Sequence, residues 1–210
     1  MSVESDVDQA AGLSEPAAAA TAANPALLGL MTFLPAGITL GLWFIGYLPL
    51  DVPGGMIPII TASAGLFLLI AAVWAAQLGA SAVAAIFGVF SAFWLSFAIL
   101  LVGATSGWWG YTAESITSVQ AAYLLSFLLV FILLTVITLR LPVTFTAGFV
   151  FVDITFALAL GGVLGGPPIL FTLAGCTTFI FCAIYAYILA DGMSQELGGK
   201  AYPLGNPIAK

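Results

Sequence analysis

Long apolar runs alternate with short polar or Gly- and Pro-rich stretches along most of this chain. Each run is long enough to cross about 30 Å of hydrocarbon as a helix, whereas a membrane β-barrel needs shorter segments of alternating polarity. The pattern therefore predicts an all-α integral membrane protein with six transmembrane helices. The predicted spans cover residues 25–48, 55–77, 81–103, 118–139, 143–164 and 168–190.

The polar flanks divide the chain into three parts. Residues 1–23 contain four acidic residues and an Ala-rich run, which predicts a disordered tail. This tail lacks the basic start and apolar core of a signal peptide, so we expect it to be retained. Residues 24–192 form the predicted six-helix membrane domain, and residues 193–210 form a second tail.

Basic residues indicate the orientation. Arg140, Lys200 and Lys210 are the three basic residues of the chain. With six spans, the link between the fourth and fifth helices and the C-terminal tail fall on one side, which the positive-inside rule assigns to the cytoplasm. We therefore expect a multi-pass protein of the plasma membrane with both termini cytoplasmic.

Composition narrows the range of functions. The chain is 62% hydrophobic and 6% charged, whereas a soluble domain carries about a quarter charged residues. It has no basic run that would suit nucleic acid and no His for a His-dependent triad or a His-ligated metal site. Cys176 and Cys182 are six positions apart, too far on one helix for a disulfide. We expect no metal, no cofactor and no enzymatic activity.

The first apolar run begins with Asn24-Pro25-Ala26-Leu27-Leu28-Gly29-Leu30. Asn suits a helix N-cap, and Pro suits the first helical position, so a helix start is the simplest interpretation. The free N–H groups of such a start also favour an anion. Farther along, Gly29, Phe33, Gly37 and Gly41 recur every fourth residue, a spacing typical of close helix packing.

Residues 24–30 resemble the signature Asn-Pro-Ala-Pro-Leu-Gly-Leu of the acetate uptake transporter family, the succinate–acetate/proton symporters, with Leu27 in place of the second Pro. Ser91-Ala92-Phe93-Trp94-Leu95 resembles the family's Gly-Ser-Phe-Trp-Leu in the third span. Asp191, Gly198 and Tyr202-Pro203-Leu204-Gly205 resemble its C-terminal pattern. The resemblance covers about residues 24–205.

The resemblance implies a six-helix symporter or channel for acetate and related short-chain carboxylates such as succinate, linked to protons. It also implies a homo-hexamer in membrane lipid with one path per protomer. Asn24, Pro25, Gly29 and Leu30 are then signature or substrate-binding residues. The family's narrow constriction falls on Phe33, Phe90 and Val152, where Phe90 replaces the usual Tyr and Val152 the usual Leu. The lost hydroxyl implies a drier constriction.

Asp153 is the ionisable residue deepest inside a predicted span. A carboxylate at that depth is costly unless it is protonated, paired or hydrated. Two interpretations remain open: a proton site for transport, or a neutral acid bonded to a hydroxyl on a neighbouring helix.

Two departures from the family leave proton coupling open. Gln77 is the only polar side chain between residues 68 and 80 apart from the indole of Trp74, and Trp43 stands where some members have His. One rival function is therefore a passive pore for small neutral solutes or protonated acids. The other is a non-transporting membrane sensor or assembly protein.

Overall fold

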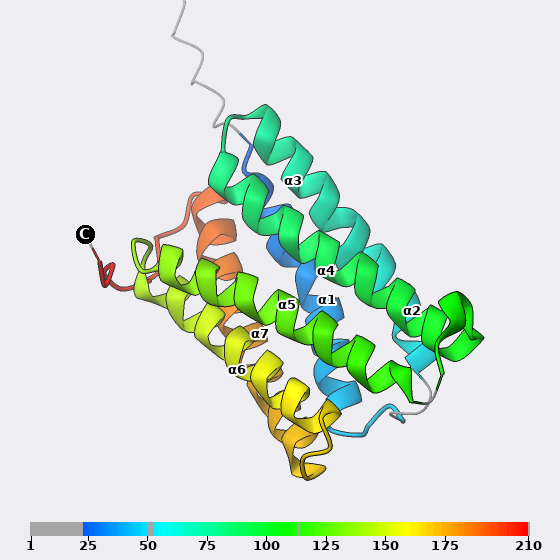
Figure 1. The fold of residues 1–210 in the computed structure, drawn as a ribbon. Coiled ribbons are helices and arrows are strands. Elements are labelled where there is room, and N and C mark those ends of the chain that lie inside the picture. The colour runs from blue at the N-terminus through cyan, green and yellow to red at the C-terminus, as the bar shows by residue number, and fades with distance from the viewer. Residues whose placement is uncertain (1–22, 50–52, 113, 210) are drawn as a thin grey trace, which may run out of the picture.

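The computed structural model describes residues 23–49, 53–112 and 114–209. The predicted disordered tail, apart from its last residue, lies outside these residues, as do Asp51 and Lys210. Within the described part, six helical spans are long and apolar enough to cross a membrane, and they form one bundle (Figure 1). The predicted number and type of spans are confirmed.

The spans agree with the sequence prediction in position and differ at their ends. The third and sixth predicted spans run on to Ser106 and Glu196, and the first stops at Phe44. The elements are α1 (Pro25–Phe44), η1 (Pro53–Gly55), α2 (Ile57–Ile59), η2 (Ile60–Leu66), α3 (Phe67–Gln77), α4 (Ser81–Ser106), η3 (Trp108–Gly110), α5 (Ser115–Thr138), α6 (Val143–Val163) and α7 (Ile169–Glu196).

The second span is not a uniform α-helix, because its middle section, η2, is a π-helix. A π-helical segment changes the intrahelical hydrogen bonding, and two side-chain hydrogen bonds connect this segment to other helices. The Ser91 hydroxyl of α4 donates to the Gly65 carbonyl over 2.7 Å. In turn, the Ser63 hydroxyl of η2 donates to the Thr32 carbonyl of α1 over 2.6 Å. Such π segments are frequent at functional sites, and this one joins three spans.

The six spans follow one another around a closed ring. α1 packs against α7 and the second span, the second span against α4, α7 against α6, and α6 against α5. The ring closes between α4 and α5, where the helix backbones approach each other least and aromatic rings fill the space. The interior of this ring is the hydrophobic core of the molecule.

Glycines on α1 allow its close contacts with neighbouring helices. A Cβ atom at Gly29 would lie 2.5 Å from the Phe87 ring of α4, and one at Gly37 would lie 2.6 Å from the Cys182 sulfur of α7. A Cβ at Gly41 would lie 2.8 Å from the Phe179 ring of α7. The packing interpretation of this four-residue spacing is confirmed.

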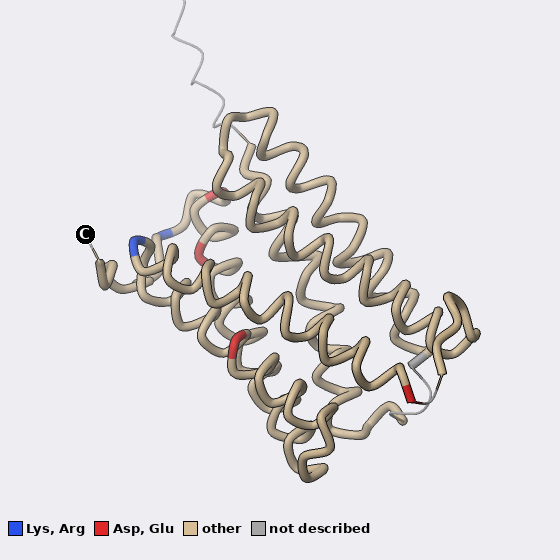
Figure 2. The backbone as a smooth tube through the Cα atoms, viewed as in Figure 1, with Lys and Arg blue, Asp and Glu red and all other residues tan. Residues whose placement is uncertain are grey.

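The start of α1 and the C-terminal segment lie at the same end of the bundle (Figure 1). The link that contains Arg140 lies beside the C-terminal segment, because the Leu139 carbonyl accepts the Ile208 and Ala209 N–H groups. The basic residues, drawn in blue, lie at this end, which we call the terminal end (Figure 2). The Tyr202 backbone N–H donates to the Asp191 carboxylate over 2.7 Å. The Leu204 carbonyl then accepts bonds from the Thr144 amide and hydroxyl at 3.2 and 2.7 Å. The C-terminal segment is thus fixed across the ends of α6 and α7.

Candidate functional site

A cavity of about 360 Å³ opens near the terminal end and is called the terminal cavity. It lies between α1, α3, α4, α6 and α7, and nearly all its walls are apolar. Its lining residues are Asn24, Ala26, Leu30, Phe33, Leu68, Val83, Ile86, Phe87, Phe90, Leu141, Phe145, Phe149 and Tyr185.

A second cavity of about 230 Å³, the distal cavity, lies toward the opposite end of the bundle. It lies at the joint between α4 and α5 and also meets α1, α6 and α7. Its lining residues are Trp43, Phe44, Phe97, Leu100, Leu101, Gln120, Tyr123, Leu124, Ala159, Val163 and Phe171. The two cavities share no lining residue, so the structure separates them.

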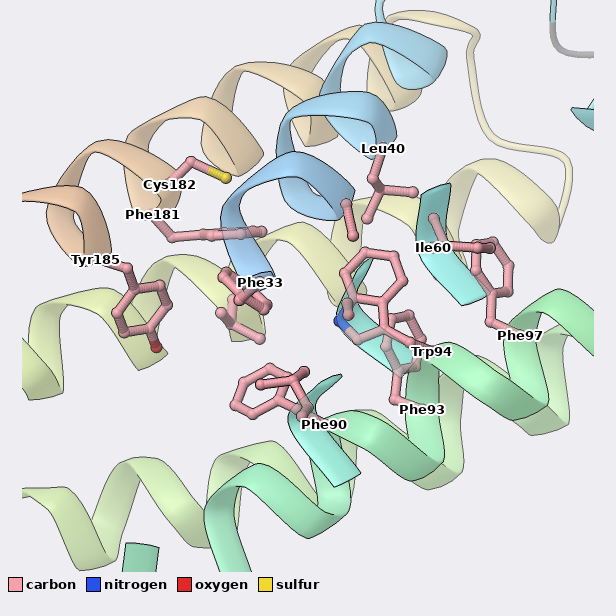
Figure 3. Close-up of a cluster of buried hydrophobic side chains, with 14 of the residues drawn as sticks. Phe33, Leu40, Ile60, Phe90, Phe93, Trp94, Phe97, Phe181, Cys182 and Tyr185 are labelled. Atoms are coloured by element: carbon pink, nitrogen blue, oxygen red, sulfur yellow. The ribbon is translucent and has the colours of Figure 1, made fainter. Parts of the chain in front are cut away.

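Between the cavities, side chains from several helices form a cluster of stacked and edge-on rings (Figure 3). We call it the aromatic barrier: Phe33, Phe90, Phe93, Trp94, Phe97, Phe131 and Phe156. Each of these side chains is at most 8% exposed. A solute that crossed the bundle through its interior would have to pass this barrier.

The residues of the predicted constriction lie at or beside the barrier. The rings of Phe33 and Phe90 meet edge to face with centroids 5.4 Å apart, and both line the terminal cavity. Val152 is 1% exposed, belongs to the same core cluster and lines neither cavity. Phe90 also stacks on Phe131 of α5 at 4.8 Å, a contact that sequence reasoning did not anticipate.

The signature residues lie at the mouth of the terminal cavity. Asn24 caps α1, because its side-chain oxygen accepts the Ala26 N–H over 3.0 Å, and Pro25 occupies the first helical position. Asn24 and Leu30 line the cavity, whereas Gly29 packs against Phe87. The helix-start interpretation is confirmed, and the anion role of these residues stays a prediction.

Asp153 lies at the contact between α5 and α6 and lines neither cavity. The Thr135 hydroxyl of α5 donates to its Oδ2 over 2.6 Å. Oδ1 is buried and has no hydrogen-bond partner among the residues that the structure describes. The structure thus supplies the neighbouring hydroxyl that one interpretation of Asp153 required, and it places the carboxyl beside the barrier rather than on a cavity wall.

Tyr185 and Phe149 are site residues that the sequence did not single out. The Tyr185 ring lies 5.5 Å from Phe33 and 6.2 Å from Phe149, and all three line the terminal cavity. A Cβ at Gly148 would lie 2.8 Å from the Tyr185 ring, so this glycine makes room for it. In a span that is apolar all round, hydropathy does not tell which aromatic faces the interior.

Comparison with known proteins bears on this geometry. The sequence profile described as the GPR1/FUN34/yaaH family matches residues 8–197. A solved structure titled as the bacterial acetate channel SatP is similar, with a TM-score of 0.77 and 24% sequence identity. The match covers 87% of this chain and 99% of that one, and at this identity it shows a shared fold. A search of curated protein sequences gave no match.

Proposed function

This chain belongs to the GPR1/FUN34/yaaH family, and from that premise we propose that it carries acetate and related short-chain carboxylates across a membrane. The observation that carries this proposal is the pair of cavities at opposite halves of the bundle, separated by the aromatic barrier. Each cavity has room for a small solute. The family resemblance, the acetate channel of similar fold and this arrangement support the same function.

A barrier of aromatic side chains suits the passage of a small anion better than a barrier of aliphatic side chains would. Aromatic rings carry partial negative charge on their faces and partial positive charge on their edges. A carboxylate that passes ring edges therefore loses less electrostatic stabilisation than it would among aliphatic side chains. Phe33, Phe90 and Val152 form the narrowest part of the path in this proposal, and the missing hydroxyl at Phe90 makes that part less polar.

Proton linkage through Asp153 is the finer part of the proposal. Thr135 has one hydroxyl hydrogen but two acceptors in reach, the Phe131 carbonyl at 3.0 Å and Asp153 Oδ2 at 2.6 Å. If Asp153 is protonated, its own O–H donates to Thr135, and the threonine hydrogen is free for the Phe131 carbonyl. In the protonated state, the Asp153 O–H, the Thr135 hydroxyl and the Phe131 carbonyl therefore all have hydrogen-bond partners. Ionisation removes one of these bonds next to Phe131 of the aromatic barrier and Val152 of the proposed constriction.

The assembly and orientation belong to the same proposal. We expect the terminal end to face the cytoplasm, so that Arg140 and Lys200 raise the local concentration of anions at the mouth of the terminal cavity. The chain then lies in the plasma membrane as a homo-hexamer with one path per protomer. α5 buries only Phe131 and Thr138 in a single protomer, so most of its surface is available to lipid or to a neighbouring protomer.

Flux into liposomes tests the function directly. Purified protein is reconstituted, and uptake of labelled acetate, succinate, lactate and glycerol is followed at pH 5.5 and 7.5, with and without a proton gradient. We expect acetate uptake that exceeds glycerol uptake and that a proton gradient accelerates. Liposomes without protein are the control. Equal uptake of acetate and glycerol would favour a passive pore, and uptake of neither would favour a non-transporting protein.

A further inference from the structure

Three hydrogen-bond donors inside the bundle have no partner within the described residues. They are the hydroxyl of Tyr185 and the indole N–H groups of Trp94 and Trp43. Tyr185 is 5% exposed and Trp94 1%. Native proteins pair nearly all of their buried donors, and an unpaired one costs stability. Three of them in one interior therefore require an explanation, and we call them the path donors.

The path donors are spread along the proposed path. Tyr185 lines the terminal cavity, Trp94 lies within the aromatic barrier, and Trp43 lines the distal cavity. Figure 3 shows Phe33 between Tyr185 and Trp94, at centroid distances of 5.5 and 6.2 Å. The row of touching rings runs Tyr185, Phe33, Trp94, Phe93, Phe97 and Trp43.

The chemistry of these groups favours one class of ligand. An indole N–H donates a hydrogen bond and accepts none, so Trp94 and Trp43 require a ligand with acceptor atoms. An ionised carboxylate offers two acceptor oxygens and no donor, and hydrogen bonds to a charged acceptor are the stronger kind. A neutral alcohol or amide would bring its own donors into walls that are almost wholly apolar. Hydrogen bonds from the path donors would therefore offset part of the cost of moving a carboxylate into apolar surroundings.

We propose that Tyr185, Trp94 and Trp43 are successive binding positions for the carboxylate of the substrate as it crosses the aromatic barrier. This inference rests on the proposed transport function and adds the residues that hold the anion. Tyr123 does not belong to the set, although it lines the distal cavity. Its hydroxyl already lies 2.7 Å from the Phe93 carbonyl and 3.1 Å from the Ser96 hydroxyl.

Substitutions that remove each donor and keep a ring test the proposal in liposomes. We expect Tyr185→Phe and Trp43→Phe each to raise the KM for acetate by about tenfold, the effect of losing a hydrogen bond to a charged group. Tyr187→Phe is the matched control, because Tyr187 lies on the same helix and bonds the Pro203 carbonyl outside both cavities. Its KM should stay within about twofold of the unaltered value.

Trp94 is so deeply buried that its substitution risks misfolding, so it is tested in the unaltered protein. The five tryptophans are labelled with ¹⁵N at the indole nitrogen, and sodium acetate is titrated against the protein in detergent. We expect the Trp94 and Trp43 indole resonances to shift, whereas that of Trp74 on α3 stays in place. Sodium chloride at the same ionic strength is the control, and single Trp→Phe variants assign the other resonances.

The outcomes separate this inference from the proposed function. If the unaltered protein moves no acetate, the proposed transport function is wrong, and so is the binding role of the path donors. If the unaltered protein moves acetate but Tyr185→Phe and Trp43→Phe leave the KM unchanged, the transport function stands and the proposed binding role of the path donors is wrong. If the Trp94 and Trp43 indole resonances do not shift with acetate in a protein that transports it, the inference is likewise wrong.

Discussion

At the scale of single residues, the hydrogen bonds around Asp153 lead to a prediction about pH. Asp153→Asn keeps the size of the side chain, and its amide can donate to Thr135 as a protonated acid would. It cannot ionise. We therefore expect a folded protein whose acetate uptake depends less on pH than that of the unaltered chain. Initial uptake rates in liposomes between pH 5 and 8 provide the measurement.

The control for this variant is Glu114→Gln, which removes a carboxylate from the loop before α5. Its pH profile should match that of the unaltered protein. An unchanged profile for Asp153→Asn would mean that Asp153 is structural. Any proton that accompanies transport would then travel with the substrate.

The second prediction at this scale concerns Phe90. Its ring lies 5.4 Å from that of Phe33 and 4.8 Å from that of Phe131, so truncation removes part of the aromatic barrier and enlarges the terminal cavity. We expect Phe90→Ala to admit larger carboxylates, measured as a higher ratio of lactate or butyrate uptake to acetate uptake. Loss of a buried ring also destabilises a fold by about 3–5 kcal/mol, so expression and melting must be checked.

Phe67→Ala is the matched control for this truncation, because Phe67 lies on α3 and is 41% exposed. Its uptake ratio should not change. If Phe90→Ala transports with the original size selection, the constriction lies elsewhere in the bundle.

At the scale of elements, the contact of α1 with α4 depends on the absence of a side chain. We expect Gly29→Ala to displace the Phe87 ring, because the new Cβ would lie 2.5 Å from it. Overpacking of this kind costs about 1–3 kcal/mol. The melting temperature in detergent should therefore fall. Gly54→Ala is the control, because a Cβ there meets no atom within 4 Å in the described structure. Equal melting of both variants would contradict the tight packing.

The same scale shows what the sequence could and could not predict. Hydropathy located all six spans because the length of an apolar run is a local property. It could not reveal the π-helical segment η2, since the bonds from Ser91 and Ser63 come from contacts with other helices. Hydropathy also gave no reason to expect Tyr185 rather than Tyr187 in the cavity wall, because both lie in the same apolar run. Packing alone places Tyr185 in the terminal cavity and Tyr187 against the Pro203 carbonyl. Phe33 and Phe90 were found through the family resemblance rather than through periodicity.

At the scale of the whole molecule, the described ends of the chain lie at the same end of the bundle (Figure 1), and their side of the membrane stays a prediction. We expect cysteines introduced as Ser5→Cys and Asn206→Cys to react with an impermeant maleimide only after cells are permeabilised. Cys176 is exposed and must first be replaced by Ala. A cysteine introduced at Gly110, in the loop at the opposite end, should react in intact cells. The reverse pattern would invert the orientation.

The joint between α4 and α5, where rings rather than backbones meet, has a consequence for how the polypeptide can be cut. A break in the loop between Ser106 and Ser115 leaves two fragments of three spans each. The two helices that it disconnects, α4 and α5, make few backbone contacts with each other. The fragments retain complementary surfaces, because α1 of the first packs along α7 of the second. Genes encoding residues 1–110 and 111–210 should therefore complement each other when coexpressed, and neither product should accumulate without its counterpart.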